Sequence, residues 1–358
     1  GFSMKTFAAD FETYYDNDVS IKNLGVARYV RETEHYMVSL YSDDFAWVGR
    51  PEDAPWHLLK DERVVAHNMS FELAVFAELR RRGLPIPFFG EAHCSANMAA
   101  FLQYPRDLAG ASQEILGIEL EKATRNFMKG KKFSDLSADD KMRVARYALL
   151  DAKACYGIWQ KEQEKWPAHE RAVSDHTIQM CAEGVQIDRE AVAAAEQKLK
   201  RALFDCEQLI PWANELDAKG KDLPVTSPKQ LAEHCRRANI PPPSSTAVSS
   251  EEFDQWAEEY ADRAPFVAAV QNWRSLNRLL TVVEAFRDRH IQGVMPYSLK
   301  YCGAQHTGRF SGDSGWNAQN LPKKPLEGVD ARGFIIPRDG CKFIISDYSA
   351  IETRVLAW

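Results

Sequence analysis

Several features that would narrow the fold or the function at once are missing from this sequence. No run of about 18 apolar residues occurs, so no membrane-spanning helix is expected. The seven cysteines never form a CxxC pair, and the nine histidines form neither HxxxH nor HExxH. This argues against a zinc site and for free thiols. Positive charge is also in deficit, since the net charge is −6 at pH 7. A nucleic-acid partner therefore requires cations that are concentrated locally.

What is present is the pattern of a globular protein with more than one domain. The 358 residues exceed what one small core holds, so two or three domains are expected. Residues 4–167 alternate strand and helix patterns, which predicts an α/β domain. Residues 168–293 are almost entirely helical in pattern, and we expect a projecting hairpin of two long helices whose tip has no core of its own. Residues 294–358 return to loops, followed by an apolar strand at 343–345 and a closing helix.

Acidic residues recur at structured positions of the first domain. In "FAADFET" (7–13), Asp10 and Glu12 share one face of a predicted strand, because alternate side chains of a strand point the same way. Tyr147 and Asp151 lie four residues apart on a helix predicted to begin after Ser137, so they share a face of that helix. Glu72 stands at the start of a helix that follows a strand. Each pattern alone is typical of solvated acids, but three separate segments offer acids, and the two carboxylates on one strand face repel each other unless a cation lies between them.

The order of these acids resembles that of the DEDD 3′–5′ exonucleases, in the variant that carries a tyrosine as YxxxD. The resemblance implies a ribonuclease H-like domain, a mixed sheet flanked by helices, that binds two Mg²⁺ or Mn²⁺ ions. Hard ions of this kind suit an all-oxygen ligand set. The implied ligands are Asp10, Glu12, Glu72 and Asp151. That family usually has aspartate where this chain has Glu72.

The same resemblance assigns further residues around the acids. It implies that Tyr147 orients the attacking water, and that Asn68 and Phe71 line the path of a single strand. The segment "KATRNFMKGKK" adds basic residues that suit backbone phosphates. They are Lys122, Arg125, Lys129, Lys131 and Lys132. A solvated loop is the alternative interpretation of that segment.

The last residues contain a second pattern. "SDYSAIETRVLAW" (346–358) closely resembles motif A of the family A DNA polymerases. The resemblance implies that Asp347 binds catalytic metal, that the carbonyl of Tyr348 faces metal, and that Glu352 crowds a ribose 2′-OH. Arg354 would lie near the primer strand. Ser349 and Glu352 also have the spacing of a capping box, which is a purely structural alternative.

An upstream segment, "TGRFSGDSGWNAQNLP" (307–322), resembles the part of the same family that touches the minor groove of the primer–template duplex. Its matching residues are Arg309, Gln319 and Asn320. Contacts in the minor groove distinguish base-pair shape more than sequence, which suits a copying enzyme.

Together these patterns predict the N-terminal part of a phage-type family A DNA polymerase. The predicted domains are a proofreading exonuclease (4–167), a helical thumb (168–293) and the first part of an α+β palm (294–358). Motifs B and C do not follow motif A, so we expect polymerisation only with a second chain or the missing C-terminal half.

The expected partners are a single-stranded 3′ end and a primer–template duplex of DNA, with no membrane, in the cytoplasm of a bacterial or phage-infected cell. Two alternatives stay open. One is a standalone DEDD exonuclease that acts on RNA, and the other is a catalytically weak DNA-clamping subunit of a split polymerase.

Overall fold

The computed structural model describes residues 3–247 and 250–358, and the chain divides into two compact units. The first unit comprises Gly1–Gly184 and Glu284–Leu321, and the second comprises Val185–Val283 and Pro322–Trp358. These divisions do not coincide with the domain boundaries expected at residues 167 and 293, so the functional domains stay a prediction. The fold is a mixed α/β arrangement with many helices.

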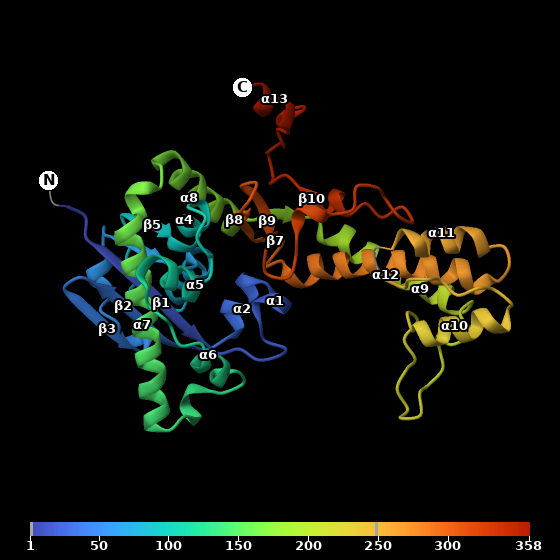
Figure 1. Ribbon diagram of the computed structural model, residues 1–358, viewed down its shortest axis with the longest axis horizontal. Coiled ribbons are helices and arrows are strands. Elements are labelled where there is room, and N and C mark those ends of the chain that lie inside the picture. The colour runs from blue at the N-terminus through green and yellow to red at the C-terminus, as the bar shows by residue number, and fades with distance from the viewer. Residues whose placement is uncertain (1–2, 248–249) are drawn as a thin grey trace. The chain divides into compact units, whose positions relative to one another are not determined.

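A mixed five-stranded sheet forms the centre of the first unit (Figure 1). Its strand order is β3-β2-β1-β4-β5. β1 pairs antiparallel with β2 and parallel with β4, β2 pairs antiparallel with β3, and β4 pairs parallel with β5. The strands are β1 (Thr6–Thr13), β2 (His35–Ser42), β3 (Phe45–Gly49), β4 (Arg63–Ala66) and β5 (Glu91–Cys94).

Helices precede, connect and follow these strands. They are α1 (Ile21–Leu24), α2 (Val26–Glu32), α3 (Met69–Arg81), α4 (Ser95–Phe101), α5 (Leu108–Ala111), α6 (Ala123–Met128), α7 (Ala138–Glu162) and α8 (Ala168–Glu183). The predicted start of α7 is confirmed, because the Ser137 side chain accepts the N–H of Asp140 as an N-cap. α7 ends at Glu162, and Pro167 is the N-cap of α8.

The two faces of β1 pack against different helices. Phe7, Ala9 and Phe11 belong to a core that includes buried residues of α2 and α3. Ala8, on the other face, packs in a core with residues of α4 and α7. Figure 1 shows α7 running across the sheet. Because burying a large apolar side chain stabilises by about 1.5–3 kcal/mol, β1 is held firmly between the two layers. Asp10 and Glu12 have the parity of Ala8 and therefore face α7.

A hairpin from far along the chain completes the core of the first unit. It consists of β8 (Leu299–Ala304) and β9 (Arg309–Gly312), and a short strand, β7 (Val294–Met295), precedes it. Tyr301 and Cys302 of β8 are buried among residues of α4 and α7. The Tyr301 hydroxyl donates to Glu170 of α8, and its carbonyl accepts a hydrogen bond from Arg106. The hairpin is therefore an integral part of this unit.

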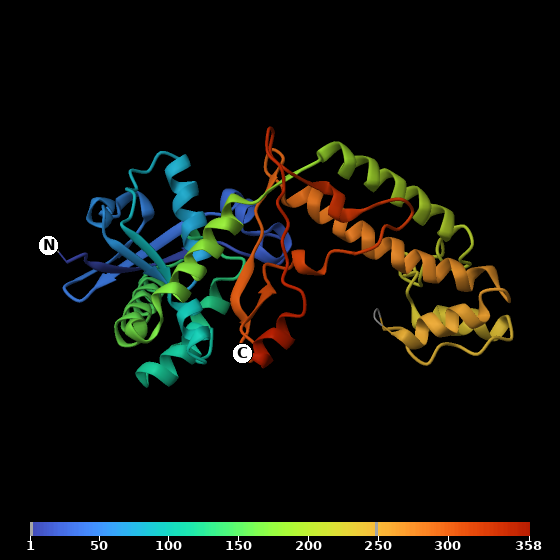
Figure 2. The ribbon, with the colours of Figure 1, turned by 90° about the horizontal axis from the view of Figure 1, so that it is seen from above.

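The second unit is mainly helical. Its elements are β6 (Val185–Ile187), α9 (Arg189–Glu207), α10 (Pro228–Arg237), α11 (Glu251–Tyr260), β10 (Ile335–Ile336), α13 (Ile351–Ala357) and most of α12 (Pro265–Arg289). β10 pairs antiparallel with β6. The two long helices α9 and α12 lie alongside each other, as Figures 1 and 2 show, which is the expected hairpin. No helix of the described residues is long and apolar enough to cross a membrane.

The expectation that the far end of this hairpin lacks a core is wrong. Trp212, Leu231, Phe253, Trp256 and Phe266 are buried together there, in a cluster contributed by α10, α11, the start of α12 and the loops between α9 and α10. The loop residues of this core have no helical or strand period, so the pattern of the sequence does not show that they are buried. Trp212 also donates its indole N–H to the carbonyl of Val225 at 3.1 Å.

Two local predictions near the end of the chain are also wrong. Residues 343–345 form no strand and are exposed. Among the described residues no neighbouring strand pairs with this segment, and an unpaired strand leaves its backbone groups unsatisfied. Ser349 is also not the N-cap residue that the spacing to Glu352 indicates. The N-cap of α13 is Ala350, in a left-handed conformation with φ 53°, and no side chain caps the helix.

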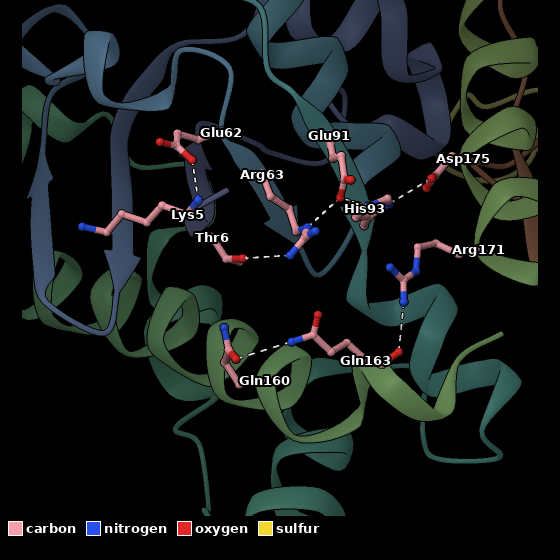
Figure 3. A network of polar contacts seen from close by, with 10 residues as sticks. All are labelled: Lys5, Thr6, Glu62, Arg63, Glu91, His93, Gln160, Gln163, Arg171 and Asp175. Atoms are coloured by element: carbon pink, nitrogen blue, oxygen red, sulfur yellow. Dashed lines mark hydrogen bonds and ion pairs between the residues drawn. The ribbon is translucent and has the colours of Figure 1, made fainter. Parts of the chain in front are cut away.

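A polar network joins β4 and β5 to α8 (Figure 3). Arg63 donates from Nε to Glu91 Oε2 at 2.6 Å, and this hydrogen bond is the main reason that the pKa of Glu91 falls to about 2. The His93 ring lies 2.9 Å from Glu91 Oε2 through Nε2, and 2.9 Å from Asp175 Oδ2 of α8 through Nδ1. It also stacks on Trp159 with the ring centroids 5.2 Å apart.

The network predicts a dependence of stability on pH. Because the folded pKa of Glu91 lies below its usual value of 4.5, its stabilising effect is complete above pH 4.5 and is lost as the pH falls towards 2. Glu91 is partly exposed, so Glu91→Gln should lower the free energy of unfolding at pH 7 by only about 1 kcal/mol. Urea unfolding between pH 7 and pH 2 tests this. The difference from wild type should shrink below pH 4.5, while the exposed control Glu52→Gln should show no such trend. A pH-independent difference would contradict the assignment.

Candidate metal centre

Three of the predicted acids meet between β1 and α7. One carboxylate oxygen from each of Asp10, Glu12 and Asp151 lies within 4.8 Å of the others. Asp10 and Glu12 come from alternate positions of β1, and Asp151 comes from the middle of α7. The three side chains are half-buried, and within the described part of the chain none of them forms an ion pair with a basic residue. We refer to these three residues as the carboxylate cluster.

A buried serine fixes α7 over the carboxylate cluster. Ser39 lies directly opposite Asp10 in the register of β1 and β2, and it is fully buried. Its hydroxyl donates to the carbonyl oxygen of Ala148 on α7 at 2.8 Å. Ala148 lies between Tyr147 and Asp151 in the sequence of α7. This hydrogen bond therefore fixes the position of the helix, and with it both side chains, relative to Asp10. Nothing in the sequence pattern distinguishes Ser39 from an ordinary strand residue.

Glu72 lies close to the cluster but outside the group of three. It is 4% exposed at the first turn of α3. Its Oε2 is buried and has no hydrogen-bond partner among the described residues, while the backbone N–H of Phe11 opposes the effect of burial on its pKa. Glu72 thus offers a free carboxylate oxygen beside the carboxylate cluster.

Burial and mutual repulsion make these acids hard to ionise. Burial is the main cause that raises the pKa of Glu12 to about 8, and the negative charge of Asp151 adds to it. Burial also raises the pKa of Asp151 to about 6. The pKa values of Asp10 and Glu72 are raised as well, first by burial and then by Glu12. In the absence of a cation, the site therefore favours protonated carboxyl groups near neutral pH.

The donor set fits a hard divalent cation. All the side chains are carboxylates, which Mg²⁺ and Mn²⁺ prefer to nitrogen or sulfur ligands. Asp10 Oδ2 and Glu72 Oε2 are buried without hydrogen-bond partners, and buried polar oxygens of this kind usually have one. A cation bound here would satisfy both atoms and relieve the repulsion within the carboxylate cluster.

The other residues predicted for this site lie around it. Tyr147 lies one helical turn before Asp151 on α7, and burial is the main cause that raises the pKa of Tyr147, with the negative charge of Asp151 adding to it. Asn68 is the exposed N-cap residue of α3, yet its side chain forms no capping hydrogen bond. Phe71 is half-buried, with its ring centroid 6.3 Å from that of Tyr29. Both Asn68 and Phe71 therefore flank the start of the helix that carries Glu72.

The residues predicted for the DNA minor groove lie at the surface of the first unit. Arg309 is exposed at the start of β9. Gln319 and Asn320 are exposed on a short 3₁₀ helix, Ala318–Asn320, that contacts β9.

The residues predicted for motif A belong to the second unit. Asp347 and Tyr348 lie before α13 in a segment without regular structure, and Glu352 and Arg354 lie on α13. All four are exposed. Arg354 donates from Nε to the carbonyl of Ser349 at 2.9 Å. Among the residues that the structure describes, Asp347 is not part of a group of three possible metal ligands.

Comparison with solved structures identifies the class of the fold. The chain is similar to the POL domain of Pol1 from M. smegmatis, determined in complex with DNA primer-template and dNTP, with a TM-score of 0.62 and 16% identity. The similarity covers 99% of this chain and 59% of that one. The fold is thus that of a DNA polymerase.

Sequence comparison then identifies the family. Residues 189–358 match the model of DNA polymerase family A. The chain is 25% identical to DNA polymerase I of Caldicellulosiruptor bescii over 58% of its own length and 23% of the relative. It is 23% identical to the DNA polymerase of Bacillus phage SP02 over 99% of its own length and 61% of the relative. Residues 189–358 thus match DNA polymerase family A, and the chain as a whole is similar to DNA polymerases. It spans about a quarter of the length of the DNA polymerase I relatives, such as those of C. bescii and Lactococcus lactis.

The position of Ser39 leads to a prediction about the carboxylate cluster. Ser39→Ala should lower the free energy of unfolding by about 1 kcal/mol, because one buried hydrogen bond is lost. It should also weaken Mn²⁺ binding by about 10-fold, as expected when a residue that orients metal ligands is removed. Ser42→Ala is the matched control, since Ser42 is buried in the same strand but bonds to Asp44. Equal Mn²⁺ affinities of the two variants would contradict the assigned role.

The raised pKa values lead to a second prediction. Folded carboxyl groups with raised pKa values stabilise the protein below their unfolded pKa, and this stabilisation is lost as the pH rises through the folded values of about 6 and 8. In EDTA, the melting temperature should therefore fall between pH 5 and pH 8, and Asp151→Asn should flatten that trend. Mn²⁺ at about 100 times its dissociation constant should restore about 2.7 kcal/mol at pH 8. Identical pH profiles of wild type and Asp151→Asn would contradict this interpretation.

Proposed function

We propose that the α/β part of the first unit is a ribonuclease H-like, DEDD-type 3′–5′ exonuclease that proofreads for a family A DNA polymerase. The observation that carries the proposal is the convergence of Asp10, Glu12 and Asp151 within 4.8 Å, on a mixed sheet of order β3-β2-β1-β4-β5. Buried Glu72, with one free oxygen, adds the fourth acid. The proposed substrate is the single-stranded 3′ end of DNA.

The proposed cofactor is a pair of Mg²⁺ or Mn²⁺ ions held by these four acids. Two ions in such a site stabilise the attacking and the leaving oxygens of an in-line phosphodiester cleavage. The side chains of the protein are proposed to position the water molecule and the DNA strand. Tyr147, one helical turn from Asp151, is proposed to orient a water molecule at the carboxylate cluster. Asn68 and Phe71, beside Glu72, are proposed to hold the unpaired strand.

Polymerisation is proposed for the whole protein. The match of residues 189–358 to the family A model and the motif A string support DNA-directed nucleotidyl transfer, with Asp347 as a metal ligand and Glu352 as the residue that excludes ribonucleotides. Arg309, Gln319 and Asn320 are proposed to contact the primer–template duplex, with Arg354 near the primer strand. The phage relative, which aligns over 99% of this chain, supports a phage-type polymerase. The predicted thumb and palm are proposed as its DNA-holding parts.

One assay tests the exonuclease proposal. The protein is incubated with 5′-labelled single-stranded DNA or RNA and Mg²⁺, Mn²⁺ or EDTA. We expect a ladder of DNA products with either metal and none with EDTA. Asp10→Ala should lower the rate by about 100-fold or more, because a direct ligand should matter more than the residues that orient ligands. Asp53→Ala, which changes an exposed acid outside the carboxylate cluster, should retain the rate.

The other outcomes distinguish the alternatives. Preferential degradation of RNA would favour a standalone ribonuclease. Binding of DNA without degradation in any metal would favour a DNA-clamping subunit in which Glu72 has replaced the usual aspartate at the cost of activity. A wild-type rate in Asp10→Ala would contradict the proposed site.

A further inference from the structure

The basic segment that contains α6 is tied to the end of β1. Tyr15, three residues after Glu12, donates from its hydroxyl to the carbonyl oxygen of Arg125 at 2.6 Å. The carbonyl of Tyr15 accepts the N–H of Gly130 at 2.8 Å. These two hydrogen bonds bracket the second half of α6 and the turn after it. The segment is therefore attached to the strand that carries two of the three acids.

α7 holds the same segment from the other side. Met128 of α6 is buried with Val144 and Ala148 of α7, in the half of that helix that precedes Asp151. Phe127 packs against this core, and the guanidinium of Arg143 lies 5.0 Å from the centroid of its ring. α6 is thus fixed between the two elements that form the carboxylate cluster.

Among the basic residues of this segment, Arg125 is the one whose own backbone is bonded to Tyr15, three residues after Glu12. The residue is exposed, and its guanidinium forms no hydrogen bond or ion pair with any residue in 3–247 or 250–358. Lys131, in contrast, lies over the ring of Phe127 with its ammonium 3.4 Å from the centroid.

A positively charged side chain in this position would reduce the repulsion between the acids and an anionic substrate. A phosphodiester is an anion, and it must approach a group of acids that repel it. An arginine guanidinium presents a planar pair of N–H donors that matches two phosphate oxygens, and it stays charged at every relevant pH. Because the Arg125 guanidinium pairs with no group of the described residues, it can bind such an oxygen pair without breaking a contact among them.

We propose that Arg125 binds a backbone phosphate of the single-stranded DNA end that enters the carboxylate cluster, and so positions that end for cleavage. The proposal rests on the exonuclease function proposed above. It assigns Arg125 to the substrate and leaves the metal ligands as described.

Three variants test this role: Arg125→Gln, Arg125→Lys and the control Arg50→Gln, which removes an exposed arginine that pairs with Glu52. Cleavage of 5′-labelled single-stranded DNA is measured with Mg²⁺ or Mn²⁺. Arg125→Gln should lower kcat/KM by about 10- to 100-fold, as expected for the loss of a charge-assisted contact. Arg125→Lys should recover part of this loss, and Arg50→Gln should match wild type.

Two further measurements separate substrate binding from a structural effect. In EDTA, fluorescence anisotropy with a labelled oligonucleotide gives affinity against salt concentration, and Arg125→Gln should reduce the slope by about 0.7, the value for one phosphate contact on a single strand. Mn²⁺ binding should be unchanged or tighter in Arg125→Gln, because a nearby positive charge is removed. Weaker Mn²⁺ binding would show that Arg125 supports the fold of the site, and it would overturn the proposal.

The outcomes also separate this inference from the function on which it rests. If wild type degrades DNA and Arg125→Gln does so at the same rate with the same salt slope, the role of Arg125 is wrong and the exonuclease stands. If wild type degrades nothing, the exonuclease is wrong, and the salt slope alone decides whether Arg125 holds a phosphate.

Discussion

Repulsion among buried carboxylates is the constraint on which the first unit depends. Asp10, Glu12 and Asp151 lie within 4.8 Å of one another, and the chain provides no basic side chain in contact with them among its described residues. Such an arrangement opposes folding unless protons or metal ions neutralise it. The packing around the carboxylate cluster therefore has to supply the free energy that this repulsion costs. The apolar face of β1, buried against α2 and α3, and the packing of α7 on the other face provide this stabilisation.

Two polar contacts of the unit hold α6 and α7 beside the carboxylate cluster. Ser39 fixes α7 at Ala148, and Tyr15 fixes α6 at Arg125. Both contacts join a side chain of the sheet region to a backbone carbonyl of a helix, so each sets the position of a whole element. The acids are therefore placed by groups that do not themselves carry charge, which leaves the carboxylate oxygens available to ligands.

How much of this could be predicted from the sequence depends on the range of the interactions. The shared face of Asp10 and Glu12 follows from the period of a strand, and that of Tyr147 and Asp151 from the pitch of a helix. Both are local rules, and the structure brings these residues together as predicted, although their catalytic roles stay a prediction. Ser39 could not be identified, because its importance arises from a partner 109 residues away. The strand expected at 343–345 does not form, since a strand requires a neighbour that no local pattern reveals.

The burial of Tyr301 and Cys302 in the core of the α/β part has a consequence for synthesis on the ribosome. The sheet and α7 are complete once about residue 162 has emerged, yet β8, which covers Trp159 and Trp166, is made well over a hundred residues later. Until then an apolar patch stays exposed to solvent, and exposed patches of this kind favour aggregation of nascent chains. The smallest fragment able to close this core is thus discontinuous, and cutting the chain after residue 167 would yield an α/β fragment with a permanently open flank.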